Sequence, residues 1–246
     1  MRISYIEYTA VKAENNAAEV RTDVDLALLM LVSLVKARDN ETASHLVRTA
    51  QYVRLLAEYL RNHPRFAQTL CDETIELLVK SAPLHDIGKV GIPDRVLLKP
   101  GRLTPDEFAV MRTHAKLGYD VLAQAEAQLG HPLPCLAFAK EIALSHHEKW
   151  DGSGYPQGLA GDAIPMSARL MAVADVYDAL TSRRSYKPAM SHEEALQIMR
   201  QGRGRHFDPD VLDAFLVLEQ QFAAIAARHG DTVGDLTALA QRVLHG

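Results

Sequence analysis

The sequence carries imidazole and carboxylate side chains at spacings that could hold a divalent cation. Glu41 and His45 are four residues apart in a helical stretch, so they share one helix face and could grip one ion. Two adjacent pairs, His85-Asp86 and His146-His147, stand where helical stretches meet glycine-containing segments. A lone helical histidine is far more often solvated or hydrogen-bonded than a metal ligand. Two such pairs and an i,i+4 pair in one chain, however, favour a metal site.

Two further residues join this set. His114 is expected inside the helix that begins after Thr104, and Asp175 stands in the apolar stretch LMAVADVYDAL. A carboxylate buried there without a partner would be costly, so Asp175 should face a cation. Imidazole and carboxylate ligands without thiolate suit iron, manganese or zinc. The set exceeds what one ion needs, and Asp86 could bridge two ions that clamp a phosphodiester.

Helices must position these side chains, because the hydrophobic period from Asp23 onward is helical and alternating strand-like runs are absent from the sequence. Buried helices are expected over residues 26–35 and around residues 46–60. The pattern predicts a single all-α domain over residues 23–246, C-terminal helices included. Residues 1–22 are polar and weakly patterned, which is typical of a tail or linker.

Capping patterns mark where later helices begin. Thr104–Glu107 and Ser191–Glu194 are capping boxes, and Asp208 is followed by a proline at the first helical position. Glycines recur between Trp150 and Pro165, which predicts a long loop there.

Composition limits the classes of partner. The net charge of -4 argues against a nucleic acid polymer held on a basic surface, but allows a small anion held by a few local cations. The N-terminus lacks the basic flank and apolar core of a signal peptide, and the run at residues 26–35 is too short to span a bilayer. We therefore expect a cytoplasmic protein with no membrane partner.

The motifs resemble a known family. The segment His85-Asp86-Ile-Gly-Lys89, then His146-His147-Glu-Lys-Trp-Asp-Gly-Ser-Gly-Tyr-Pro156, is similar to the HD-GYP family, a branch of the HD phosphohydrolases. Lys-Pro-Gly at 99–101 and ADVYDALTSRRSYK at 174–187 extend the match to about residues 23–215. The resemblance implies an HD-domain helical bundle with a bi- or trinuclear metal centre between its helices and a GYP-containing loop. It also implies hydrolysis of cyclic di-GMP to pGpG, with some members continuing to GMP.

The resemblance assigns roles to particular residues. Asp86 and Lys89 would be catalytic, with Lys89 near the scissile phosphate, and Arg184 and Lys187 would hold the phosphates of the dinucleotide. Members with three metals carry an extra acid where Glu41 stands, so a trinuclear centre of iron or manganese is favoured over a binuclear one. The implied metal ligands are Glu41, His45, His85, Asp86, His114, His146, His147 and Asp175.

The GYP loop has two interpretations. The Tyr155 side chain could contact a base of the substrate, or the loop could be a rigid turn that supports His146 and His147. In the second case the loop would also offer a docking surface, for which diguanylate cyclase domains are candidate partners.

The resulting hypothesis is a cyclic di-GMP phosphodiesterase in which a metal-bridging hydroxide attacks phosphorus. Alternatives are an HD-type phosphohydrolase of another nucleotide, an enzyme selective for cyclic GMP-AMP, and a sensor or adaptor that binds the dinucleotide without turnover. Family members usually carry a receiver or other sensory domain before this unit, and here about twenty residues precede it. That fits a stand-alone enzyme or one whose regulatory part lies outside this sequence.

Overall fold

The computed structural model describes residue 38 and residues 43–182 and 189–229. The expected helix at 26–35, the boundary between residues 22 and 23, Glu41, Arg184 and Lys187 lie outside these residues. The described part is helical, with isolated bridges but no strands, which confirms the predicted all-α class. Its α-helices are α2 (Ala43–Leu60), α3 (Asp72–Ser81), α4 (Asp94–Leu97), α5 (Pro105–Arg112), α6 (His114–Leu129), α7 (Pro134–Ser145), α8 (Met166–Thr181), α9 (His192–Gln201), α10 (Pro209–Val217) and α11 (Glu219–Arg228).

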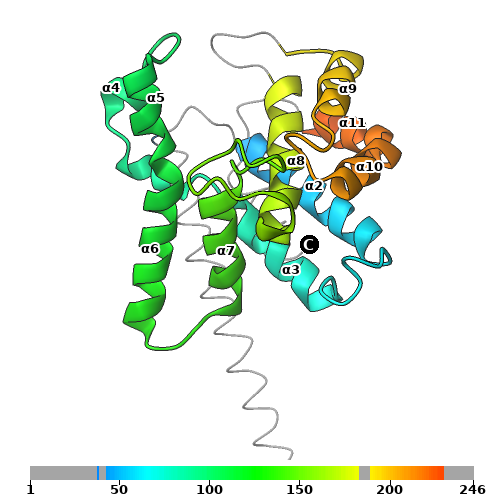
Figure 1. Cartoon of the computed structure of the whole chain (residues 1–246), viewed down its shortest axis with the longest axis horizontal. Helices are drawn as coiled ribbons and strands as arrows, with labels where there is room; N and C mark the ends of the chain where they lie inside the picture. Colours follow the sequence, from blue (N-terminus) through cyan, green and yellow to red (C-terminus); the bar gives the residue numbers. More distant parts are fainter. Residues whose placement is uncertain (1–37, 39–42, 183–188, 230–246) are drawn as a thin grey trace, which may run out of the picture.

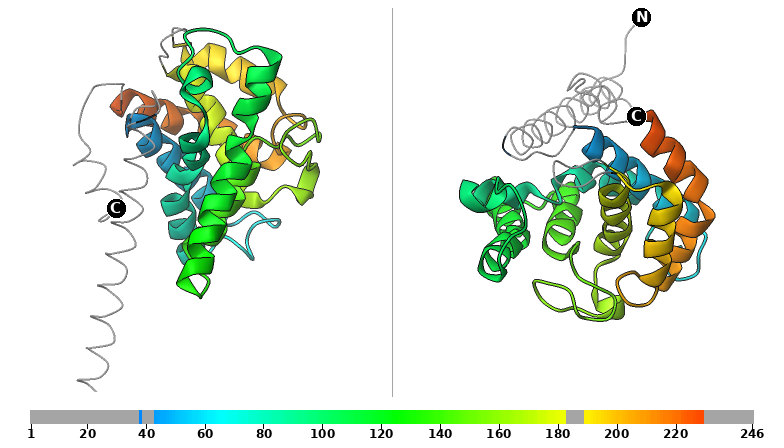
Figure 2. Two further views of the ribbon diagram at one scale, coloured as in Figure 1. Left: turned by 90° about the vertical axis from the view of Figure 1, so that its left-hand side faces the viewer. Right: turned by 90° about the horizontal axis from the view of Figure 1, so that it is seen from above.

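Helices α2, α7, α9 and α10 pack against α8, which lies in the middle of Figure 1 between α7 and the group α9–α11. Helices α2 and α3 pack on each other, and they also contact α8 and α7 respectively. The view from above in Figure 2 places α4–α6 at one end of the arrangement and α9–α11 at the other. Short 3-10 turns, η1 (Ala82–Leu84) and η2 (Ile87–Gly91), join α3 to α4.

Two apolar clusters form the core. The larger one joins α2, α3, α8, α9, α10 and α11, and includes Tyr52, Tyr177 and Phe222, all fully buried. The smaller one joins the start of α2 with η1, α6 and α7. Leu84 and Ile87, on either side of the His85-Asp86 pair, both belong to the smaller cluster. The core thus anchors the backbone next to the polar side chains that matter for chemistry.

The predicted helix starts are confirmed. Thr104 and Ser191 each accept the backbone N–H of the glutamate three residues later, and that glutamate bonds back to the capping residue. Asp208 accepts the Asp210 N–H and caps α10. These caps satisfy N–H groups that a helix leaves without an intrahelical partner.

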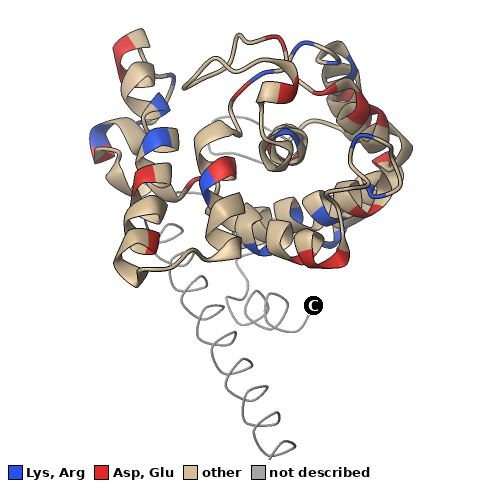
Figure 3. Cartoon of the chain, turned by 60° about the horizontal axis from the view of Figure 1, so that its bottom comes forward, with Lys and Arg blue, Asp and Glu red and all other residues tan. Residues whose placement is uncertain are grey.

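Charges on the described helices are interspersed. Figure 3 shows Lys and Arg next to Asp and Glu along the helices in that view. Arg54 lies 2.5 Å from Glu76, and Arg203 lies 2.6 Å from Asp213. Exposed pairs of this kind contribute at most about 1 kcal/mol each. None of the described helices combines the length and hydropathy that a bilayer crossing requires.

Candidate metal centre

The HDIGK segment is held against the start of α6. A Cβ atom at Gly88 would lie 1.9 Å from the carbonyl oxygen of His114 and 2.4 Å from the Gly118 nitrogen, so only glycine allows this approach. The close contact brings the Asp86 carboxylate next to the His114 ring. The motif therefore needs glycine at position 88 because a larger residue would block this contact.

The expectation that His114 lies inside the helix capped by Thr104 is wrong. That helix, α5, ends at Arg112, and His114 begins α6. The Thr113 hydroxyl donates to the Val110 carbonyl at 2.7 Å, and the Thr113 N–H bonds the same carbonyl at 3.1 Å. This tight i→i−3 turn ends α5 and redirects the chain. The break places His114 at the edge of the site.

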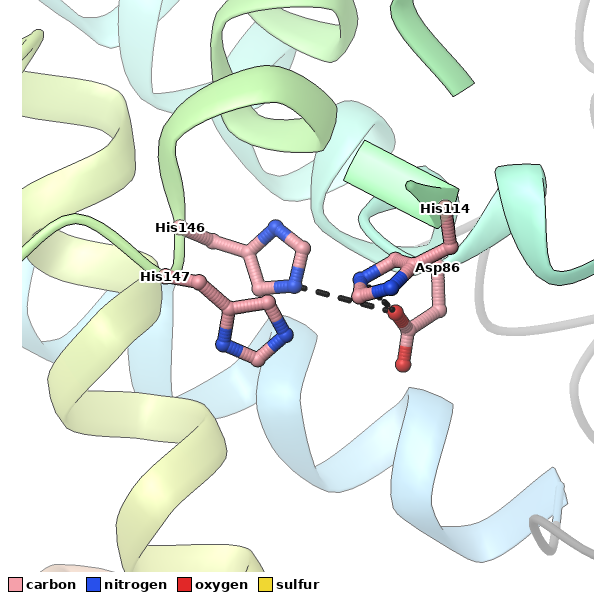
Figure 4. Close-up of side chains that lie close together, drawn as sticks. All are labelled: Asp86, His114, His146 and His147. Carbon is pink, nitrogen blue, oxygen red and sulfur yellow. Dashed lines mark ion pairs between the residues drawn. The ribbon is translucent and has the colours of Figure 1, made fainter. Parts of the chain in front are cut away.

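Three histidine side chains converge on Asp86, as Figure 4 shows. Asp86, His114, His146 and His147 each offer a ligand atom within 4.8 Å of the others, and we call them the Asp86 group. Asp86 Oδ1 lies 3.2 Å from His114 Nε2 and 3.7 Å from His146 Nε2. Asp86, His114 and His146 are buried, and His147 is half-buried.

The histidine tautomers in this group decide what it can bind. His114 Nδ1 lies 2.7 Å from the Met111 carbonyl and His146 Nδ1 lies 2.8 Å from the Ile142 carbonyl, so both Nδ1 atoms must carry the hydrogen. When neutral, each ring turns an Nε2 lone pair toward Asp86 Oδ1. These three buried atoms have no hydrogen-bond partner. Three acceptors that face one another without a donor would be satisfied by a cation bound between them.

Burial favours the neutral form of His146 and His147. It lowers the pKa of His146 to about 4, and it holds the pKa of His147 well below its ordinary value. Burial opposes ionisation of Asp86, but the nearby Lys89 ammonium outweighs it and holds the pKa of Asp86 well below its usual range. His146 and His147 are therefore neutral and Asp86 is ionised near neutral pH, and these are the protonation states that metal ligands need.

A second set lies beside the first. His45, His85 and Asp175 also offer ligand atoms within 4.8 Å of one another, and we call them the His45 group. The Nε2 atoms of His45 and His85 are 3.4 Å apart, and Asp175 Oδ1 is 3.9 Å from His45 Nε2. Asp86 Oδ2 is 3.3 Å from His85 Nε2, so Asp86 turns one oxygen to each group. A carboxylate that bridges two ions needs this placement.

Lys89 lies close to the same carboxylate. Its Nζ is 2.8 Å from Asp86 Oδ2, one turn further along the chain. This position is consistent with the sequence prediction that Lys89 belongs to the site. The predicted phosphate cations and Glu41 cannot be placed in the same way, because they lie outside the described residues.

The GYP loop packs over His147. The Tyr155 ring stacks on the His147 ring at a centroid distance of 4.7 Å, and the Arg112 guanidinium lies 4.5 Å from the centre of the Tyr155 ring. A Cβ at Gly154 would meet the Lys149 nitrogen at 2.3 Å, so this glycine lets the loop fold back. These contacts match the interpretation in which the loop supports the histidine pair.

Two residues of this region were missed in the sequence. Asp178 on α8 and Arg48 on α2 are both buried and hydrogen-bonded to each other. Arg48 and His45 hold the pKa of Asp178 at about 2 against the opposing effect of burial. Each residue follows a predicted ligand by three positions, since Arg48 follows His45 and Asp178 follows Asp175. That shared helix face is the signal that could have found them.

The donor set suits divalent metals. Histidine nitrogen and carboxylate oxygen without sulfur fit iron, manganese or zinc. The sequence of the chain also matches the profile of the HD domain, over residues 40–211. This chain belongs to the HD domain family.

Relatives within this HD domain family agree with the HD-GYP resemblance. The chain is 58% identical over 213 residues to a protein of Vibrio cholerae named "Cyclic di-GMP phosphodiesterase", covering 87% of this chain and 43% of the relative. It is 41% identical over 197 residues to a "3'3'-cGAMP-specific phosphodiesterase 2" of the same organism, covering 80% of this chain and 35% of the relative. The HD domain described here thus spans less than half the length of these relatives.

The fold is also found in a solved structure. A cyclic GMP-AMP specific phosphodiesterase of V. cholerae aligns with a TM-score of 0.55 at 18% identity, covering 91% of this chain and 53% of the other. At this identity the likeness concerns the fold alone. It confirms the predicted HD-domain helical bundle.

Proposed function

We propose that this HD domain is a metal-dependent phosphodiesterase that hydrolyses cyclic di-GMP to pGpG, with GMP as a possible further product. The observation that carries the proposal is the set of buried, partnerless atoms around Asp86, where the lone pairs of His114 and His146 face a carboxylate oxygen. The name of the 58% identical relative supports the substrate.

The two groups of ligands support two metal ions. Asp86, His114, His146 and His147 would hold one, and His45, His85 and Asp175 the other, with Asp86 shared between them. Glu41 would serve a third, as the sequence resemblance implies. Iron or manganese is favoured. Bound there, the ions would polarise the phosphodiester and activate water for attack at phosphorus.

The remaining side chains would bind and orient the substrate. Lys89, held beside Asp86, would place its ammonium near the scissile phosphate and stabilise charge that develops on the non-bridging oxygens. Arg184 and Lys187 would hold the phosphates. Tyr155 lies within reach of the histidines, and an edge of its ring could meet a base.

The exposed tip of the GYP loop is the proposed docking surface for a diguanylate cyclase domain. Residues 156–158 are exposed, whereas Tyr155 beneath them faces the site. A cytoplasmic location remains a prediction. Pull-down of purified cyclase domains by the wild type and by a Gln157→Glu variant would test the docking surface.

The test of the proposed function begins with the wild-type protein purified without oxygen. Metal content per chain is measured, and the protein is then incubated with cyclic di-GMP and iron(II) or manganese(II), with products separated by chromatography. We expect bound metal and formation of pGpG or GMP.

A substrate panel separates the alternatives. Faster hydrolysis of 3'3'-cyclic GMP-AMP than of cyclic di-GMP would change the substrate assignment. Hydrolysis of guanosine tetraphosphate or a dNTP alone would indicate another HD-type phosphohydrolase. Metal and dinucleotide binding without products would indicate a sensor, and a protein that binds no metal would contradict the proposal altogether.

A further inference from the structure

Arg48 and Asp178 form a buried unit beside the candidate metal centre. Both side chains are nearly inaccessible, at 2% and 1% exposure, and they come from different helices, α2 and α8. Neither belongs to the two groups of candidate ligands. Burying a charge pair in this way carries a desolvation cost that packing alone does not require, since apolar residues of similar volume are often as stable. A role beyond packing would explain the pair.

The carboxylate is fully engaged. Arg48 Nε donates to Asp178 Oδ1 at 2.6 Å and Arg48 Nη2 donates to Oδ2 at 2.8 Å, which makes a two-point contact. Oδ2 also accepts His45 Nδ1–H at 2.8 Å and the Ser182 hydroxyl at 3.1 Å. The arginine therefore fixes the position of the carboxylate, and the carboxylate fixes the ring of His45.

The contact between Asp178 and His45 decides which way the lone pair of the His45 ring points. Because Asp178 can only accept while ionised, His45 Nδ1 must carry the hydrogen, and the Nε2 lone pair turns toward His85 and Asp175. A carboxylate behind a metal-binding imidazole fixes its tautomer and raises its basicity. His85, by contrast, places Nδ1 2.9 Å from the uncharged carbonyl of Ala82.

The unit also reaches the end of α8. Arg48 Nη2 donates to the Ser182 hydroxyl at 2.7 Å, and Arg48 Nη1 donates to the carbonyl of His229 at 2.6 Å. Ser182 is the residue directly before the segment that contains Arg184 and Lys187. The same guanidinium thus ties the carboxylate that holds His45 to Ser182, the C-cap of α8.

We infer that Asp178, clamped by Arg48, is a positioning residue that orients His45 toward a divalent metal of the His45 group. This inference rests on the proposed metal-dependent function. It assigns no contact between Asp178 and the metal itself. Loss of an outer partner of this kind typically weakens metal binding about 10- to 100-fold.

Titration of metal-free protein with manganese(II) tests the inference, with calorimetry or electron paramagnetic resonance as the readout. Asp178→Asn removes the charge and keeps the shape, and we expect about 10- to 100-fold weaker binding at one class of site, with the other class unchanged. Asp178→Glu should restore part of the lost affinity. Arg48→Lys keeps the cation without the two-point contact, and tests the same unit if Asp178→Asn folds poorly.

Asp208→Asn is the matched control. Asp208 is equally buried and pairs with Arg65 and Arg169, but it lies outside both groups of ligands. We expect it to lower the melting temperature and leave manganese affinity unchanged. Equal affinity of Asp178→Asn and wild type would overturn the inference while leaving the proposed function in place. A wild type that binds no manganese or iron would instead overturn the proposed function.

Discussion

The two groups of candidate ligands are built in different ways. In the Asp86 group, His114 and His146 are oriented by carbonyls three or four residues away in their own stretch of chain. In the His45 group, His45 is oriented by Asp178, 133 residues away in sequence. Local backbone thus orients His114 and His146, whereas the packing of α2 on α8 orients His45. His85, in the same group as His45, is held like the first two, by the carbonyl of Ala82.

The difference predicts different sensitivities. A ring held by its own backbone keeps its orientation as long as the local helix end persists. A ring held by a distant carboxylate depends on tertiary packing and on a buried charge, so it responds to changes far along the chain. A change at Asp86 should affect both groups, because its Oδ1 lies next to His114 and its Oδ2 lies next to His85 of the His45 group.

The largest effect is expected from Asp86→Ala. Both groups lose a shared carboxylate, so turnover of cyclic di-GMP should fall by more than the roughly 100-fold that loss of an outer partner costs. Bound metal should fall at both sites, with helical content by circular dichroism near that of the wild type. Asp120→Ala removes an exposed carboxylate that pairs with Lys116, and should change neither property. Retained turnover in Asp86→Ala would show that the metal centre is misassigned.

A pair of histidine variants would separate the groups. His114→Ala should remove metal from the Asp86 group and leave the His45 group able to bind, and His45→Ala should do the reverse. Metal analysis of each variant after loading with manganese(II) and removal of excess metal checks this. Loss of all metal in both variants would mean that the two groups bind as one cooperative unit and not as two separately supported sites.

The sequence predicts most of what depends on neighbouring residues. The capping boxes at Thr104 and Ser191 are confirmed because a cap needs only residues within one turn. The pairing of Arg48 with Asp178 was missed because its partners are 130 residues apart and meet only when α2 packs on α8. The break at Thr113 was missed for a local reason. The Thr113 hydroxyl competes with the helix backbone for the Val110 carbonyl.

A moderate effect is expected from Glu148→Gln. Glu148 is 1% exposed, and its two carboxylate oxygens accept the backbone N–H groups of Gln157 at 2.7 Å and Leu159 at 3.0 Å. Glutamine keeps one acceptor and turns an NH2 group against the second N–H, so unfolding free energy should fall by about 1–3 kcal/mol. Denaturant unfolding measures the loss.

The exposed Glu194 supplies the control for that change. Glu194→Gln in the capping box of α9 keeps an oxygen for the cap and should cost a few tenths of a kcal/mol at most, within the range of surface substitutions. Equal effects of the two variants would contradict the view that Glu148 holds the GYP loop in place over the Asp86 group.

The smallest effect, and the finest test of how the Asp86 group is supported, comes from Tyr155→Phe. The Tyr155 ring stacks on His147 and carries the Arg112 guanidinium on its face, so Tyr155→Phe should keep the support. Tyr155→Ala should lose about 0.5–1.5 kcal/mol of ring contact in addition to the buried area of the ring. Manganese affinity of the Asp86 group should follow the same order. If the hydroxyl instead contacts a base, Tyr155→Phe should raise KM for cyclic di-GMP at unchanged manganese affinity. The two interpretations of the GYP loop thus predict different results when the Tyr155 hydroxyl is removed: an unchanged KM if the ring only supports His147, and a raised KM if the hydroxyl contacts a base.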